Sequence, residues 1–428
     1  MTKKWKEALA ALAALACARD AQAQMVDTAC FEKLTRTSLV ACATRASPAV
    51  SAERAGLRSL DGRRVAAGIW LPSNPTVSFT AGQRSSPVEG NGIDWSATLS
   101  QEVPIGGQRG KRVDLVDAEA DAQRARVVAA ERETGAGAML AYFDLLAALE
   151  EKRIADRLTD LANALIAFAR GRSDAGLTST VDADVAEAAA LRLAQVRFAA
   201  ERRVDAASAT LTVLVGGDPA RMRVTVDGQL VPLMTAPADV AALVDAAVAR
   251  RADVAIAAAE RRTQQRRADL LRRERIPNVT LSIFAQNDRI NERVLGFGVA
   301  IPIPMPAPVG QTRAGEIAEA EALADRAAAD IERVRRQIRL EVTAAASALA
   351  SRQREVAAYD PARLKRAEES LAAIAREVEA RRLPLRDALL AQQALVELLQ
   401  TAIEARRQLC FASVDLARAA ALPMVGAP

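Results

Sequence analysis

Four short segments in which apolar side chains alternate with small or polar ones constrain the fold of this chain more than any other feature. They occupy residues 76–81, 95–100, 279–285 and 295–301. A period of two places all the apolar side chains on one face of a β-strand. With its flanking residues, each run is about nine residues long, which is enough to cross a bilayer as a tilted strand. A half-buried sheet in a soluble domain alternates in the same way, so the pattern alone leaves both interpretations open.

The segments around these strands favour long helices and a membrane position for the strands. Residues 108–170 and 312–381 have apolar positions every three or four residues, as in coiled-coil seams, and Pro361 is expected to kink or restart the second helix. Straight helices of this length would extend about 90–100 Å. They leave little apolar surface to cover a sheet. Since no segment after the N-terminus has the ~20 apolar residues of a transmembrane helix, the strands are the part expected to enter a membrane.

Four strands cannot close a barrel, because the smallest transmembrane barrels have about eight. An open sheet in lipid would leave unsatisfied backbone groups at its edges. Several chains are therefore expected to pool their strands, and two, three or four chains would each supply an even number. The side chains predicted to face lipid are Val77, Phe79, Trp95, Leu99, Leu281, Ile283, Phe297 and Val299.

The chain contains two copies of one pattern. Residues 72–83 and 275–286 are similar, and each is followed by a second alternating run that ends in a proline, Pro104 or Pro302. Each half reads as helix, strand, strand, helix, helix. We therefore divide the chain into a signal peptide (1–23), a first structural repeat (24–216), a linker (217–237) and a second structural repeat (238–428).

The N-terminus is typical of a secretory signal. Three lysines precede an apolar run over residues 8–18, and Ala21 and Ala23 form an A-x-A cleavage site before Gln24. Cys17 leaves open whether the N-terminus carries a lipid, although Leu15 lies one place too close to this cysteine for a usual lipobox. Cys30 and Cys42 would lie about 18 Å apart in a straight helix, whereas a disulfide allows about 7 Å. A bond between them requires an irregular segment, and the sequence leaves that question open. Cys410 falls on an apolar helical stripe and is expected to be buried.

Reaction chemistry is not expected in this chain. It has no histidine, which excludes Ser-His-Asp and Cys-His catalysis and His-based zinc sites, and it has no CxxC spacing. Gly106-Gly107 lacks the lysine and serine of a phosphate-binding loop. Acids are interspersed with the bases behind the net charge of +5, which argues against nucleic-acid binding. We expect no enzyme, no cofactor, no metal site and no nucleic-acid partner.

The order of elements resembles the TolC-like outer-membrane efflux protein family. The resemblance rests on residues 74–79 (NPTVSF) and 99–112 (LSQEVPIGGQRGKR). The second stretch resembles the signature of the CzcC-like branch, which serves heavy-metal cation efflux, although Gln108 stands where that branch usually has lysine. The resemblance implies a mainly α fold with β: a long coiled-coil helical tunnel in the periplasm and four transmembrane strands per chain. These strands contribute to a 12-stranded barrel in a homotrimer. The implied partners are a periplasmic adaptor (membrane fusion) protein, an inner-membrane RND-type transporter and outer-membrane lipid.

The resemblance also implies a tunnel entrance at two helix-hairpin tips. Asp182 and Asp387 would lie at the constriction, where threefold symmetry turns each into a ring of carboxylates that favours cations. The alternative is an ordinary acidic residue at a helix start. Arg381 replaces the glycine expected at the second tip, and Pro384 is unusual there. The residues expected to dock the adaptor are Gly176, Leu177, Ser179, Leu383 and Leu385.

The sequence therefore predicts an outer-membrane channel of a tripartite efflux pump that passively exports substrates, with heavy-metal cations favoured. One alternative is the same architecture exporting organic toxicants, drugs or polypeptides. Another is a soluble periplasmic coiled-coil scaffold, which the four alternating strands argue against. A pump adaptor is a third, but adaptors have a lipoyl-like domain around a single hairpin, and the duplicated pattern argues against one.

Overall fold

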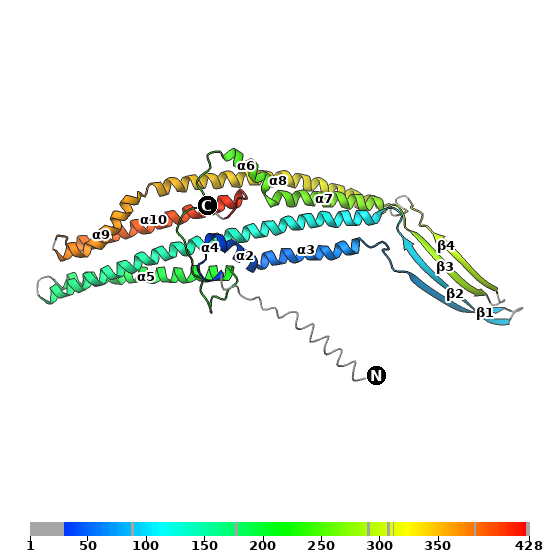
Figure 1. Ribbon diagram of the computed structural model, residues 1–428, viewed down its shortest axis with the longest axis horizontal. Helices are drawn as coiled ribbons and strands as arrows, with labels where there is room; N and C mark the ends of the chain where they lie inside the picture. The colour runs from blue at the N-terminus through cyan, green and yellow to red at the C-terminus, as the bar shows by residue number, and fades with distance from the viewer. Residues whose placement is uncertain are drawn as a thin grey trace, which may run out of the picture.

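A computed structural model shows an elongated molecule with a β-sheet at one end and helix hairpins at the other (Figure 1). It describes residues 30–86, 90–175, 179–288, 292–305, 309–310, 312–380 and 382–424. The predicted signal peptide, residues 1–23, lies outside these residues.

The same order of helices and strands occurs twice along the chain. The first half comprises α2 (Arg36–Ala46), α3 (Pro48–Ala67), β1 (Thr76–Ser86), β2 (Gly90–Val103), α4 (Gln108–Asp174) and α5 (Thr180–Leu214). The second comprises α6 (Val240–Arg250), α7 (Ala252–Arg273), β3 (Val279–Asp288), β4 (Glu292–Ala300), α8 (Ala314–Ala357), α9 (Pro361–Glu379) and α10 (Leu385–Ala419).

The two long helices differ in continuity. α4 runs unbroken for 67 residues, about 100 Å. Its counterpart in the second half is split into α8 and α9, and α9 begins at Pro361, as the sequence predicts. Proline suits the first helical position because it lacks the amide proton that the helix interior needs. Asp360 caps the new helix by accepting a hydrogen bond from the Ala362 amide at 2.9 Å. No described helix combines the length and hydropathy needed to span a bilayer.

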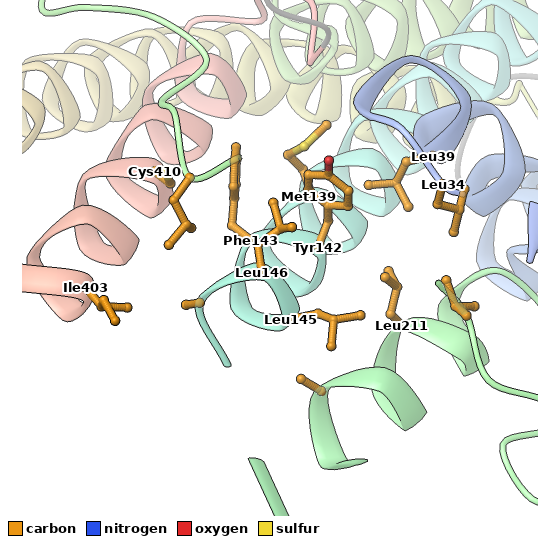
Figure 2. Close-up of a cluster of buried hydrophobic side chains, with 14 of the residues drawn as sticks. Leu34, Leu39, Met139, Tyr142, Phe143, Leu145, Leu146, Leu211, Ile403 and Cys410 are labelled. Carbon is orange, nitrogen blue, oxygen red and sulfur yellow. The ribbon is translucent and has the colours of Figure 1, made fainter. Parts of the chain in front are cut away.

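The main core joins helices from both halves of the chain to the linker (Figure 2). Tyr142 and Phe143 of α4 are fully buried there. The Tyr142 hydroxyl donates a 2.8 Å hydrogen bond to the carbonyl of Asp227 in the linker. Cys410 is buried in the same core, as predicted, and burial raises the pKa of its thiol to about 12. A second cluster, which includes Ile338 and Leu416, joins α6, α8 and α10.

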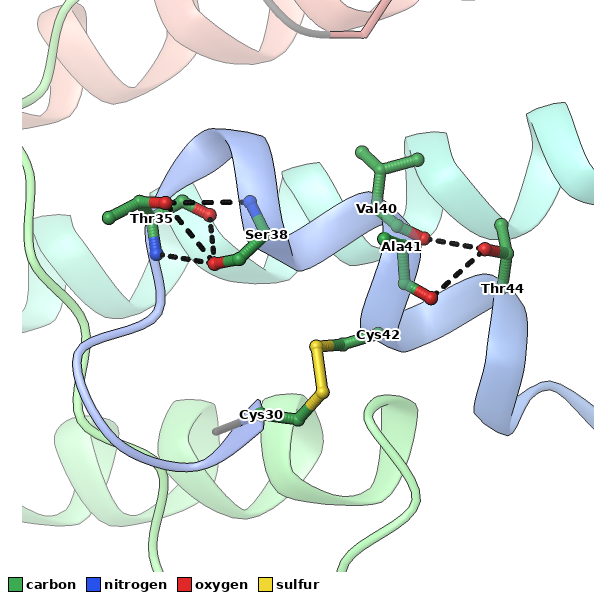
Figure 3. Close-up of a disulfide and its surroundings, with 7 residues drawn as sticks. All are labelled: Cys30, Thr35, Ser38, Val40, Ala41, Cys42 and Thr44. Carbon is green, nitrogen blue, oxygen red and sulfur yellow. Dashed lines mark hydrogen bonds between the residues drawn. A yellow bond between two sulfur atoms is a disulfide. The ribbon is translucent and has the colours of Figure 1, made fainter. Parts of the chain in front are cut away.

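A disulfide joins Cys30 and Cys42, whose Cα atoms are 5.8 Å apart (Figure 3). The irregular segment that such a bond requires is present, because α2 begins only at Arg36. Thr35 starts the helix with a capping box in which its side chain and that of Ser38 bond each other's backbone amides. The segment before it pairs with the linker through a parallel bridge between Leu34 and Val226. The disulfide thus fastens the N-terminal segment to the middle of the molecule.

Candidate functional site

The four strands form one antiparallel sheet in the order β1-β2-β3-β4. Its register aligns Val77 with Leu99, Leu99 with Ile283, and Ile283 with Phe297. One apolar side chain from each strand therefore lies in a single row across the sheet. Because side chains alternate between faces, the neighbouring rows on this face hold most of the remaining apolar residues of the strands.

This apolar face is open to solvent in the single chain. Phe297 is 84% exposed and Val77 is 76% exposed, and Phe79 stacks on Trp95 with ring centroids 6.3 Å apart. All eight side chains predicted to face lipid are exposed. No helix covers this face, as Figure 1 shows by the separation of the sheet from the helices. A contiguous apolar surface of this kind marks a contact with a membrane or another protein.

The opposite face carries small and polar side chains. Thr76 and Ser100, which lie opposite each other, share a hydrogen bond of 2.7 Å between their hydroxyls. Phe284 and Val294 are the exceptions, and Phe284 lies over Gly296 of the next strand. The sheet is therefore apolar on one side and mainly hydrophilic on the other, which is the division required of a wall between lipid and a wetted lumen.

Both edges of the sheet are unpaired within the described chain. β1 pairs only with β2, and β4 pairs only with β3. Exposed edges offer rows of free amide and carbonyl groups for pairing with another strand. Each edge strand is about ten residues long, so the sheet is built to be continued by further strands.

The far end of the molecule carries two helix hairpins, α4–α5 and α9–α10 (Figure 1). Asp182 is the third residue of α5, and Asp387 is the third residue of α10, where its side chain is exposed. The structure thus places the two aspartates at matching positions at the starts of two hairpin helices. Both positions also suit an acid on ordinary grounds, since the helix dipole favours negative charge in the first turn.

The residues predicted to dock an adaptor are less fully described. Ser179 is the N-cap of α5 and accepts a hydrogen bond from the Val181 amide at 3.2 Å. Leu383 packs partly against the main core. Leu385 begins α10. Gly176 and Leu177 lie outside the described residues.

The sequence interpretation missed a charged network that joins the two halves of the chain. Asp144 of α4 accepts hydrogen bonds from Arg203 of α5 at 3.3 Å and from Arg407 of α10 at 3.1 Å. Arg203 also binds Glu151 at 2.6 Å. The hydrogen bond from Arg407 holds the pKa of Glu404 below its usual value. Asp144 and Arg203 belong to the same helix hairpin, α4–α5, whereas Arg407 belongs to α10. No local sequence pattern therefore indicates that Arg407 joins them.

The sequence of residues 39–217 matches the family described as outer membrane efflux protein. This match points to a channel of the outer membrane with a periplasmic helical part rather than to an enzyme. The family resemblance seen in the sequence is thereby confirmed, while its heavy-metal branch stays a prediction. No protein of curated function matches the sequence.

The fold of outer-membrane channels extends over nearly the whole of this chain. The Campylobacter jejuni CmeC outer membrane channel aligns with a TM-score of 0.73 at 13% identity, covering 90% of this chain and 85% of the other. The Vibrio cholerae outer membrane protein VceC aligns with a TM-score of 0.67 at 18% identity, covering 91% of this chain and 96% of the other. A membrane protein from Pseudomonas aeruginosa aligns with a TM-score of 0.71 at 20% identity, covering 93% of this chain and 95% of the other. The mainly helical fold with one antiparallel sheet is thus confirmed.

Proposed function

We propose that three copies of this chain assemble into an efflux channel in which each copy contributes four strands to a twelve-stranded barrel. The observation that carries the proposal is the sheet, whose apolar face is exposed and whose two edge strands lack partners in the chain. Pairing β1 of one copy with β4 of the next would satisfy both edges at once. Closure into a ring would also turn the hydrophilic face toward a shared lumen.

In this proposal the chain performs no chemistry and substrates pass through it without a bound cofactor. The helices form a periplasmic tunnel whose entrance lies at the α4–α5 and α9–α10 tips. A periplasmic adaptor protein binds these tips and connects them to an inner-membrane RND-type transporter, which supplies the energy. The two structural repeats, residues 24–216 and 238–428, would each supply one hairpin to the tunnel and two strands to the barrel.

Two adjacent substitutions in β2 test the membrane position of the sheet. Leu99 lies on the apolar face and Thr98 on the other. An arginine at mid-bilayer on the lipid face costs about 2–4 kcal/mol, whereas the lumen face tolerates it. Leu99→Arg should reduce detergent-extractable trimer in the outer-membrane fraction, measured by native mass spectrometry, and Thr98→Arg should not. A wild-type chain that is monomeric without detergent would overturn the proposal.

Heavy-metal cations are the proposed cargo, because residues 99–112 resemble the signature of metal-cation efflux channels. The competing proposal is export of organic toxicants, drugs or polypeptides through the same architecture. Deleting the channel in its host should lower tolerance to divalent metal ions such as Zn²⁺, Co²⁺ or Cd²⁺, with plasmid-borne wild type restoring it. Lost tolerance to organic toxicants with unchanged metal tolerance would replace the metal assignment and leave the channel assignment intact.

A further inference from the structure

Exposed apolar side chains gather where the helices of the first half meet the sheet. The α3–β1 connection carries Ile69, Trp70 and Leu71, which are 53%, 72% and 41% exposed, and the β2–α4 turn adds Ile105 at 60%. This end of α3 and α4 abuts the sheet (Figure 1). Exposed apolar side chains are therefore present at the end of the sheet next to the helices as well as on the strands.

Two arginines at the start of α4 hold this patch in place. The Arg109 guanidinium lies over the Trp70 ring, 4.3 Å from its centroid, and its Nε donates to the Gly68 carbonyl at 2.6 Å. Arg112 donates to the Ile69 carbonyl at 3.1 Å. A guanidinium has five N–H donors. Each arginine therefore retains donors beyond the contact that it makes with the α3–β1 connection.

The charges of Arg109 and Arg112 have no carboxylate partner in the part of the chain that the structure describes. Within the described residues, neither Arg109 nor Arg112 forms an ion pair with a carboxylate, and the first turn of α4 contains no acid. Two positive charges at a helix N-terminus are unfavourable unless an anion offsets them.

The corresponding junction in the second half is different. Arg313, which stands directly before α8 at that junction, pairs with Glu274 at 3.2 Å and with Glu316 at 2.7 Å. These carboxylates raise the pKa of Arg313 above its usual value. The second junction thus supplies counter-ions to Arg313, whereas its Arg275 donates to the Thr312 carbonyl at 2.9 Å and, within the described residues, forms no ion pair.

We propose that Trp70, Arg109 and Arg112, together called the junction site, bind the phosphate of an anionic phospholipid in the leaflet that faces the helices. Guanidinium groups bind phosphate oxygens in a bidentate way. Tryptophan places its ring at the level of lipid headgroups, and each basic residue near an anionic surface adds to the attraction. The exposed Ile69, Leu71 and Ile105 contact the upper part of the acyl chains. The assignment rests on the proposed membrane position of the sheet.

Native mass spectrometry of the detergent-purified full chain tests the junction site. Phosphatidylglycerol and phosphatidylcholine are added separately, and the lipids retained per assembly are counted. We expect phosphatidylglycerol to be retained preferentially and its apparent affinity to fall roughly tenfold in Arg109→Gln/Arg112→Gln. Arg313→Gln is the matched control, because it removes one arginine at the equivalent junction, and it should bind like the wild type.

Several outcomes would overturn the assignment. Equal retention of the two lipids, or unchanged phosphatidylglycerol binding by the double variant, excludes the junction site. Complete displacement of phosphatidylglycerol by millimolar inorganic phosphate indicates a free-phosphate site instead. If the double variant fails to assemble, Arg112→Gln alone decides, since its side chain touches only one carbonyl. Absence of the wild-type protein from the outer-membrane fraction would contradict the proposed function. A wild-type trimer that shows no lipid preference would contradict only the junction site.

Discussion

Phe284 in β3 lies directly opposite Gly296 in β4, and the ring occupies the space that a side chain at 296 would fill. A Cβ atom at Gly296 would approach the Phe284 Cζ to 2.5 Å. Among the described strand residues on the hydrophilic face, Phe284 is the only aromatic one. The glycine thus lets a large ring lie flat against the sheet, an arrangement in which an aromatic side chain covers a strand glycine.

Gly296→Ala should push the Phe284 ring away from the sheet. In the proposed channel three displaced rings would narrow the lumen, and we expect lower single-channel conductance in planar bilayers. Gly82→Ala is the matched control, because Gly82 lies on the same face with no atom within 4 Å of its Cβ position. Equal conductance of the two variants would show that Phe284 does not restrict the lumen.

A half-buried charged cluster should make the helical part sensitive to acid. Arg251, at the α6–α7 junction, binds Asp253 at 2.6 Å and also pairs with Glu341 of α8, while Arg132 of α4 reaches Asp253 at 3.3 Å. Burial works to raise the pKa of Asp253, but the hydrogen bonds and charges of Arg251 and Arg132 outweigh it and lower that pKa. An acid with a lowered pKa stabilises the fold above its unfolded pKa and loses this effect as the pH falls through the folded value.

Asp253→Asn should therefore lower stability near neutral pH by roughly 1–3 kcal/mol. The difference from the wild type should begin to shrink below about pH 4, where the unfolded carboxyl becomes protonated, and should vanish only below the lowered native pKa. Thermal unfolding followed by circular dichroism between pH 3 and 7 measures both effects. Asp330→Asn removes an exposed partner of Arg333 and should change little. A stability difference that is constant over the whole pH range would show that Asp253 does not titrate as proposed.

The Cys30–Cys42 disulfide should determine the number of reactive thiols and contribute to the stability of the fold. Unfolding without reductant should expose one reactive thiol in the mature chain, Cys410, because Cys17 precedes the predicted cleavage site. In the native state Cys410 should resist alkylation at pH 8, since burial keeps it as the unreactive thiol. Cys30→Ser/Cys42→Ser should cost about 2–3 kcal/mol for a short closed loop. Three reactive thiols per unfolded, unreduced chain would contradict the bond.

The sequence predicted those features that repeat along the chain. The alternation in the strands identified eight exposed apolar side chains, because a period of two fixes the face of every residue once one is known. Pro361 marked the start of α9, because its ring and missing amide act locally.

Features that depend on distant contacts were not predictable. The hydrogen bonds from Arg203 and Arg407 to Asp144 join helices far apart in the chain, and nothing in the local pattern of charges selects these three residues among many exposed ones. The sequence left the Cys30–Cys42 disulfide undecided, because the distance between the two cysteines depends on where α2 begins. Arg109 and Arg313 both lie where a strand pair passes into a long helix, yet only the structure shows that, within the described residues, Arg313 has carboxylate partners and Arg109 has none.

The tunnel entrance is tested by removing the charges at the starts of α5 and α10. In the proposed trimer, Asp182 and Asp387 form two carboxylate rings that attract cations and hold the closed state. Asp182→Asn combined with Asp387→Asn should raise resting conductance or weaken block by divalent cations in single-channel recordings. Asp184→Asn is the matched control, because Asp184 lies two places further along α5 and is exposed. Records unchanged from the wild type would leave both aspartates with the ordinary role of acids in the first turn of a helix.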